Sequence, residues 1–215
     1  MGVRPFIAAA ALLSAFPALA GPPAKKPSDP IALAAPKGFE DAVAAIERAT
    51  GAKGGPLETG AGAIPLAEGR AFAVPANVAE RLLAGSHGAF RRAGLYLFRF
   101  ERSYGMEGDK DRIALLATGD WGAVVRRIGT SDSRHGLTTE KIIAFLAGLA
   151  KDEPFELTEV GVDYVAGTFE RSPKDAASVA RRSAEIAPDL VAGRASTLAL
   201  LTEEIRVNRT LYLIW

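Results

Sequence analysis

The 215-residue sequence contains no cysteine and only two histidines, His87 and His135. Without cysteine, the chain has no disulfide bonds, no thiolate metal ligands and no cysteine nucleophile. This composition also suits an oxidising compartment. The two histidines lack the spacing that a zinc site requires. We therefore expect no metal site and no cofactor.

The sequence also lacks an excess of either charge. It has 26 lysines and arginines against 25 aspartates and glutamates, and 48% of its residues are hydrophobic, which is typical of a globular protein. A balanced surface has no overall field that attracts nucleic acid or an anionic membrane. We expect an unidentified protein or small-ligand partner and no nucleic acid.

The longest apolar run lies at the start of the chain. Arg4 is followed by an uncharged stretch over 6–16 and then by Ala18-Leu19-Ala20, the small-x-small pattern of a cleavage site. The run is shorter than the roughly 20 apolar residues of a membrane-spanning helix. The sequence predicts a signal peptide over 1–20, a periplasmic or secreted mature protein, and no stable membrane insertion after cleavage.

Proline dominates the segment that follows the predicted leader. Residues 21–36 contain five prolines, which favour an extended backbone without regular structure. We predict a proline-rich linker over 21–36 and one α+β domain over 37–215.

In the amino-terminal part of that domain, glycines and prolines separate the predicted helices and strands. Helical spacing predicts a helix over 39–50, and residues 51–69 are predicted to form a loop. A strand is expected over 70–74, then a helix from Asn77 to Ala84. The glycine-rich part of the loop lacks the Gly-Lys-Ser/Thr of a phosphate loop.

We expect His87 to lie in a turn, because it falls in the motif Gly-Ser-His-Gly after the expected end of that helix. The next elements have clearer patterns. Residues 95–100 alternate as a central strand, with 112–117 as the partner of a hairpin. Helices are predicted over 121–128, capped by Asp120, and over 140–150, capped by Thr138 or Thr139.

The carboxyl-terminal part predicts a β-α-α-β unit over about 155–215. Residues 160–169 read as one strand, and Ser172 with Pro173 predicts the start of a helix that ends near Ile186. A second helix and a final apolar strand over 211–215 complete the unit. The fold class is α+β, a mixed sheet with helices packed on it.

Several segments of this part carry a family resemblance. They are Gly161–Phe169, the Ser-Pro-Lys-Asp at 172–175, Ala187–Val191 and the closing Leu-Tyr-Leu-Ile-Trp at 211–215. In these segments and their order, the chain resembles the bacterial domain of unknown function DUF4253 over roughly residues 70–215. The resemblance implies an architecture and no reaction. The chain departs from the family pattern at Ala187, where cysteine is usual, and at its end, where no acidic residue follows Trp215.

Five residues are candidates for binding. Asp163 stands in a predicted strand, where aspartate is disfavoured, and Asp189 follows proline in a turn between helices. Trp215 ends the final strand and also suits core packing. Asp132 and His135 share the polar loop Thr130–Gly136, in which Ser131 and Ser133 complete the ingredients of a catalytic triad.

No nucleophile elbow of the Gly-x-Ser-x-Gly type occurs, so we assign no catalytic residue. The sequence therefore favours an exported, non-enzymatic envelope protein that binds a protein or small ligand. The alternative is a hydrolase that uses the Thr130–Gly136 loop. A hydrolase of that kind would have a serine hydroxyl within hydrogen-bond reach of His135.

Overall fold

A computed structural model describes residues 29–103, 110–192 and 197–215 of the chain. The predicted signal peptide and residues 21–28 of the predicted linker lie outside the described residues. The remainder of that linker, Asp29–Pro36, is described and forms neither helix nor strand.

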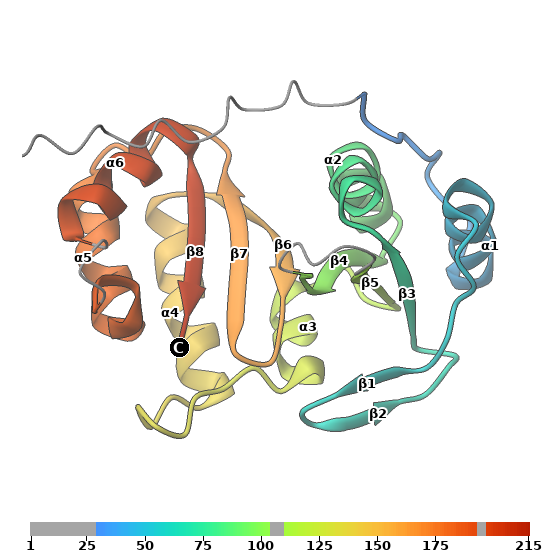
Figure 1. The fold of residues 1–215 in the computed structure, drawn as a ribbon, viewed down its shortest axis with the longest axis horizontal. Helices are drawn as coiled ribbons and strands as arrows, with labels where there is room; N and C mark the ends of the chain where they lie inside the picture. Colours follow the sequence, from blue (N-terminus) through green and yellow to red (C-terminus); the bar gives the residue numbers. More distant parts are fainter. Residues whose placement is uncertain (1–28, 104–109, 193–196) are drawn as a thin grey trace, which may run out of the picture.

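The centre of the fold is a six-stranded sheet (Figure 1). It is a mixed sheet with helices packed on it, which confirms the predicted α+β class. β4 and β6 are parallel, and every other neighbouring pair is antiparallel. The β-α-α-β unit is also present, because β7 is followed by two α-helices and then by its neighbour β8. In spatial order the strands are β3 (Gly69–Pro75), β5 (Lys110–Leu116), β4 (Tyr96–Glu101), β6 (Phe155–Val160), β7 (Tyr164–Phe169) and β8 (Thr210–Ile214).

Helices cover the two faces of the sheet unequally. One apolar cluster contains residues of all six strands and of four helices: α3 (Trp121–Ile128), α4 (Thr139–Asp152), α5 (Ala176–Ile186) and α6 (Leu198–Asn208). The cluster on the other face joins α1 (Phe39–Thr50) and α2 (Ala76–Arg92) to β3, β5 and β4 only. Within the described residues, β6, β7 and β8 contribute nothing to this second cluster, so half of that face has no helix packed on it.

The expected caps of α3 and α4 are confirmed. Asp120 accepts hydrogen bonds from the backbone N–H groups of Gly122 and Ala123, and Thr138 accepts one from Lys141. Both side chains satisfy backbone donors that the first helical turn leaves without partners.

The loop prediction for 51–69 was wrong in part. This segment contains the hairpin of β1 (Leu57–Thr59) and β2 (Gly62–Ile64), in which Leu57 is fully buried. Strands of three residues are too short to show the alternation on which sequence prediction depends.

The prediction for α2 was also wrong. The helix continues through Gly85 to Arg92, so His87 lies within a helix and is buried instead of in a turn. Gly85 is where the backbone of Ile31 crosses the helix, since a Cβ at position 85 would lie 2.4 Å from the Ile31 oxygen. Ser86 secures the crossing, because its hydroxyl donates to the same oxygen at 2.7 Å. This glycine marks a close approach and not a helix end.

Two boundaries in the carboxyl-terminal part differ from the prediction. The single strand expected over 160–169 is the end of β6, a turn at 161–163, and β7. The cap of α5 is Asp175, which accepts from Ser178 N at 2.8 Å. Ser172 instead donates to the Arg206 carbonyl, tying the start of this region to α6.

Candidate functional site

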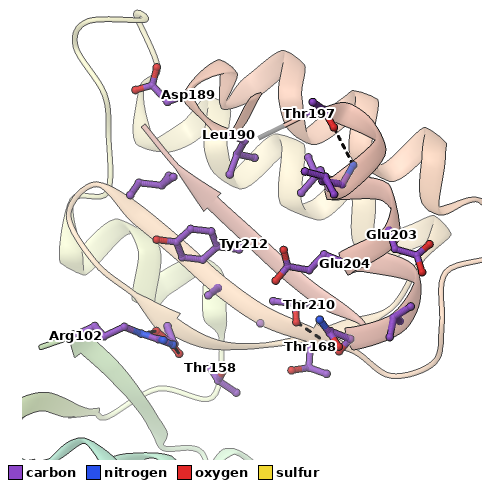
Figure 2. Close-up of a pocket in the computed structure, with 18 residues that line it drawn as sticks. Arg102, Thr158, Thr168, Asp189, Leu190, Thr197, Glu203, Glu204, Thr210 and Tyr212 are labelled. Carbon is purple, nitrogen blue, oxygen red and sulfur yellow. Dashed lines mark hydrogen bonds and ion pairs between the residues drawn. The ribbon is translucent and has the colours of Figure 1, made fainter. Parts of the chain in front are cut away.

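A groove lies over the half of the sheet on which no helix of the described residues packs. It consists of two hollows, of about 1090 Å³ and about 830 Å³. They are continuous, because five residues line both: Arg102, Thr158, Glu159, Thr168 and Thr210. We call this feature the sheet groove. α2 and α6 stand on either side of it in Figure 1, and Figure 2 shows the part beside α6.

Strand alternation produces the polar floor of the sheet groove. On β8, Leu211 and Leu213 are buried in the large core, so Thr210 and Tyr212 point to the opposite face. Thr168 on β7 is the register partner of Thr210 and lies on the same floor. Residues with small or polar side chains at these positions leave the face without the apolar surface that a covering helix would need.

The α6 wall presents apolar side chains to solvent. Leu200 and Val207 are 56% and 58% exposed, and both line the hollow beside β8. Glu203 and Glu204 stand on the same helix, and Figure 2 shows Glu204 on the same side of the strands as Tyr212. This wall can therefore contact both apolar and cationic parts of a ligand.

A buried charge cluster marks the boundary between the covered and uncovered halves. Arg99 on β4 is 6% exposed, and its Nε lies 2.9 Å from Asp111 Oδ2 on β5. Its Nη1 donates to Glu159 Oε1 on β6 at 2.9 Å, and Arg102 Nη2 donates to the same oxygen at 2.5 Å. Removing one member of such a cluster leaves a buried charge uncompensated, which costs about 3–5 kcal/mol.

Backbone irregularities accompany this cluster. The register of β4 against β5 shifts between Arg99 and Glu101, and that of β6 against β7 shifts between Leu157 and Glu159. The second shift places both Thr158 and Glu159 in the lining of the groove. Bulges of this kind redirect side chains and are common beside functional sites.

His87 and Glu156 form a pair at the α2 side of the groove. His87 is 2% exposed, and its Nδ1 lies 2.6 Å from the Leu97 carbonyl, to which it donates. Its Nε2 makes no hydrogen bond with any described residue and lies 3.4 Å from Glu156 Oε1. Burial lowers the pKa of His87, and the opposing effects of the Leu97 carbonyl and Glu156 do not offset it. The ring is consequently neutral at pH 7, with the Nε2 lone pair directed to the groove.

Carboxylates outnumber cations along the sheet groove. The acidic residues that line it are Glu80, Asp111, Glu156, Glu159, Glu170, Asp189, Glu203 and Glu204, and the basic ones are Arg99, Arg102 and Arg209. Arg99 and Arg102 are already paired within the buried cluster. Among the described residues, no ion pair involves Glu80, Glu170 or Glu204. The groove is acidic although the whole chain is nearly neutral.

Three of the candidates from the sequence come together outside the groove's centre. Asp132, 6% exposed, accepts a hydrogen bond from His135 Nδ1, and Arg134 Nη2 donates to Asp189 Oδ2 at 3.2 Å. Burial acts to raise the pKa of Asp132, but the hydrogen bonds from His135 and Arg134 outweigh it and lower the pKa. Asp189 also lies at the edge of the larger hollow.

The other two candidates line neither hollow of the sheet groove. Asp163 is exposed in the turn between β6 and β7, not within a strand as predicted, and its carbonyl accepts from Trp215 N at 3.2 Å. Trp215 is 4% exposed and belongs to the large core. Its indole therefore contributes to packing.

The Thr130–Gly136 loop does not assemble a triad. Ser131 Oγ donates to the Gly129 carbonyl at 3.2 Å, and in the described part of the chain no hydrogen bond joins Ser131 or Ser133 to His135. The described residues also contain no cluster of three or more histidine, aspartate or glutamate side chains suited to a metal ion. Across the same residues, no helix is both long and apolar enough to cross a membrane.

The sequence alone predicted neither the sheet groove nor the pair of His87 and Glu156. One signal was available: Arg99 continues the apolar face of Leu95 and Leu97 two residues further along a central strand. A charge at such a position indicates a buried ion pair or a site. His87 gave no comparable signal, because its burial depends on the packing of α2 against β4, where the ring contacts Leu97 and Tyr96.

The carboxyl-terminal part of the chain is similar to a known protein family. Residues 112–215 match the family model described as Domain of unknown function (DUF4253). This match bears out the resemblance to the family from within β5 to the end of β8. Searches of curated proteins and of solved structures each found no significant match. The family segment includes the groove floor and the α6 wall, whereas α2 and His87 precede it.

Proposed function

We propose that the protein acts outside the cytoplasm as a non-enzymatic binding protein that holds an extended, lysine- or arginine-rich polypeptide segment in the sheet groove. The observation that carries this proposal is the acidic groove over β6, β7 and β8. Because the protein as a whole is nearly neutral, a requirement for solubility does not explain the concentration of carboxylates in this groove.

The shape of the groove supports an elongated ligand. Its two hollows follow each other across three strands, and the floor offers threonine hydroxyls instead of a deep pocket. The exposed Leu200 and Val207 provide apolar contacts beside the carboxylates. A segment of polypeptide combines a polar backbone, aliphatic stems and charged ends, and matches each of these surfaces.

The charge supports a basic ligand over a neutral or acidic one. Glu80, Glu170 and Glu204 are not neutralised by any arginine or lysine among the described residues. Opposite charges across an interface raise the association rate and exclude partners of the wrong sign. An acidic polypeptide would meet repulsion along the whole groove.

The direct test is calorimetric titration with capped hexalysine, hexaserine and hexaglutamate at low salt. We expect the protein to bind hexalysine and to bind neither hexaserine nor hexaglutamate. Combined replacement of Glu80→Gln, Glu170→Gln and Glu204→Gln should raise its Kd by about tenfold or more. The matched control replaces three exposed carboxylates elsewhere, with Glu58→Gln, Asp163→Asn and Glu185→Gln, and should leave the Kd nearly unchanged. Equal weakening by both triple variants would contradict a groove site.

Export is the second part of the proposal and is tested separately. Arg4, the apolar run and Ala18-Leu19-Ala20 support cleavage after Ala20. Mass spectrometry of the protein from its native source should identify Gly21 as the amino terminus. A chain that retains Met1 would refute export by a cleaved leader.

A hydrolase remains the alternative, since one observation favours it. Asp132 fixes the tautomer of His135 and directs its Nε2 away from the carboxylate, as an orienting aspartate does for a general base. The base would have to activate water, because Ser131 is bonded elsewhere. If the alternative holds, His135→Ala lowers a hydrolytic activity by about 10²–10⁴-fold. A His135→Ala variant with unchanged peptide binding and no lost activity favours the binding protein.

A further inference from the structure

The environment of His87 leaves one of its nitrogens available in a way that packing does not explain. The ring is held in place by its Nδ1 bond to the Leu97 carbonyl and by an edge-to-face contact with Tyr96, with ring centroids 4.9 Å apart. Nε2 has no hydrogen bond from the described residues although the side chain is 2% exposed. A buried acceptor without a donor costs about 1–3 kcal/mol. A ligand that supplies the donor would remove this cost.

The tautomer defines what that ligand must offer. Because Nδ1 carries the proton that the Leu97 carbonyl accepts, Nε2 of the neutral ring is an acceptor. Glu156 Oε1, 3.4 Å away, is an acceptor as well. The two lone pairs converge without a proton between them. A group that donates two N–H bonds from one centre and carries positive charge satisfies both atoms at once.

The surroundings favour an ammonium group. Glu156 is 42% exposed, so the pair is accessible from its carboxylate side, and both residues line the smaller hollow. The nearest cation to the carboxylate is Arg91, whose Nη1 lies 4.0 Å from Glu156 Oε1, too far for a hydrogen bond. A lysine ammonium is a compact charge with three donors on a flexible stem, and can approach from solvent to this depth.

We infer that His87 and Glu156 form a lysine subsite, in which the ammonium group of one lysine of the bound segment donates to His87 Nε2 and Glu156 Oε1. This assignment rests on the proposed function and makes it specific. α2 supplies His87, and β6 supplies Glu156. The subsite therefore joins the amino-terminal half of the chain to the DUF4253 segment.

The test combines affinity with a spectroscopic signal from His87. Capped hexalysine is titrated into the protein, into Glu156→Gln and into Glu58→Gln, an exposed carboxylate outside both hollows that serves as the control. A charged hydrogen bond contributes about 1.5–3 kcal/mol, so Glu156→Gln should raise the Kd by about tenfold to a hundredfold. Glu58→Gln should change it by less than about threefold, since an exposed charge away from the ligand interacts weakly with it.

The ¹⁵N shift of His87 Nε2 reports the contact itself. We expect an unprotonated Nε2 in the free protein, and on titration a shift in the direction of hydrogen-bond acceptance that is absent from Glu156→Gln. Hexalysine binding with equal affinity for Glu156→Gln, and with the Nε2 signal unmoved, overturns the subsite and leaves the proposed function standing. Absence of hexalysine binding to the unmodified protein overturns the proposed function and the subsite together.

Discussion

The two halves of the sheet differ on one face although they share the other. Over β3, β5 and β4, the side toward α2 carries apolar residues such as Phe72, Leu97 and Ile113, each 0–1% exposed. Over β6, β7 and β8 the same side carries Thr158, Thr168 and other polar residues, and it is the floor of the groove. The covered half is packed as a core, and the uncovered half is the surface that we propose as the binding site.

The boundary between the halves is itself polar. Arg99, Asp111 and Glu159 occupy adjacent strands where the apolar face ends. Their charges are paired across β5, β4 and β6, so the sheet remains continuous while the face changes character. The comparison predicts that changes in the core, at the boundary and on the floor have effects of decreasing size on stability.

Removing β8 should have the largest effect. Deletion of residues 210–215 takes Leu211, Leu213 and Trp215 from the core, and burial of each contributes about 1.5–3 kcal/mol. The sum approaches the whole stability of a typical domain. We expect little soluble, folded protein by circular dichroism. Ile214→Thr, on the groove side of the same strand, should cost about 1 kcal/mol. A truncated chain with an unchanged melting temperature would refute this account of β8.

At the boundary, Arg99→Ala should cost about 3–5 kcal/mol, because it leaves Asp111 and Glu159 buried with their main partner removed. Arg102→Ala is the matched control. Its side chain is 44% exposed and pairs with the same Glu159, and we expect a loss of about 1 kcal/mol or less. Urea denaturation measures both. Equal losses in the two variants would show that the cluster is not a buried one.

Two glycines of α2 test how the covered half is held. Gly85→Ala should destabilise the protein by about 1–3 kcal/mol, because its Cβ would meet the Ile31 backbone oxygen at 2.4 Å. Gly88→Ala meets only the ends of two side chains, Arg92 Nη1 at 3.5 Å and Glu156 Oε1 at 3.9 Å, and should gain about 0.5–1 kcal/mol from helix propensity. The melting temperatures of the two variants, measured by thermal denaturation, test this difference. A gain for both would mean that the Ile31 crossing is dispensable.

The smallest effect concerns pH. Burial lowers the pKa of His87 below 6.5, so the unfolded chain binds a proton that the folded chain resists. Stability is complete above pH 6.5 and should fall as the pH drops below that value toward the lower folded pKa. Glu156 and Arg91 face the ring and act in opposite directions on it. In His87→Gln, the decline in melting temperature between pH 7.5 and 5.5 should be smaller. If the melting temperature of His87→Gln declines as much as that of the unmodified protein, groups other than His87 cause the decline.

Much of the architecture could be predicted from sequence, and the reason is local. α3 and α4 have caps and apolar spacing within their own residues, and the β-α-α-β unit has strong strand and helix patterns. The failures depended on distant contacts. Gly85 looked like a helix end because the crossing of Ile31 cannot be read from neighbouring residues.

The candidate site was less predictable than the fold. Asp132, His135 and Asp189 were chosen for their residue types, and the structure does bring them close through Arg134. The sheet groove could not be anticipated, because it exists only where β6, β7 and β8 extend beyond α2. An uncovered sheet face is a property of the topology, and no short motif encodes it.

The central claim is that the uncovered half of the sheet is the binding surface. Amide chemical-shift mapping during titration with capped hexalysine tests it most directly. The account predicts shifts in β6, β7 and β8, in α6 and on the groove side of α2, with β3 unchanged. Shifts confined to the Thr130–Gly136 loop or to the covered half would contradict it.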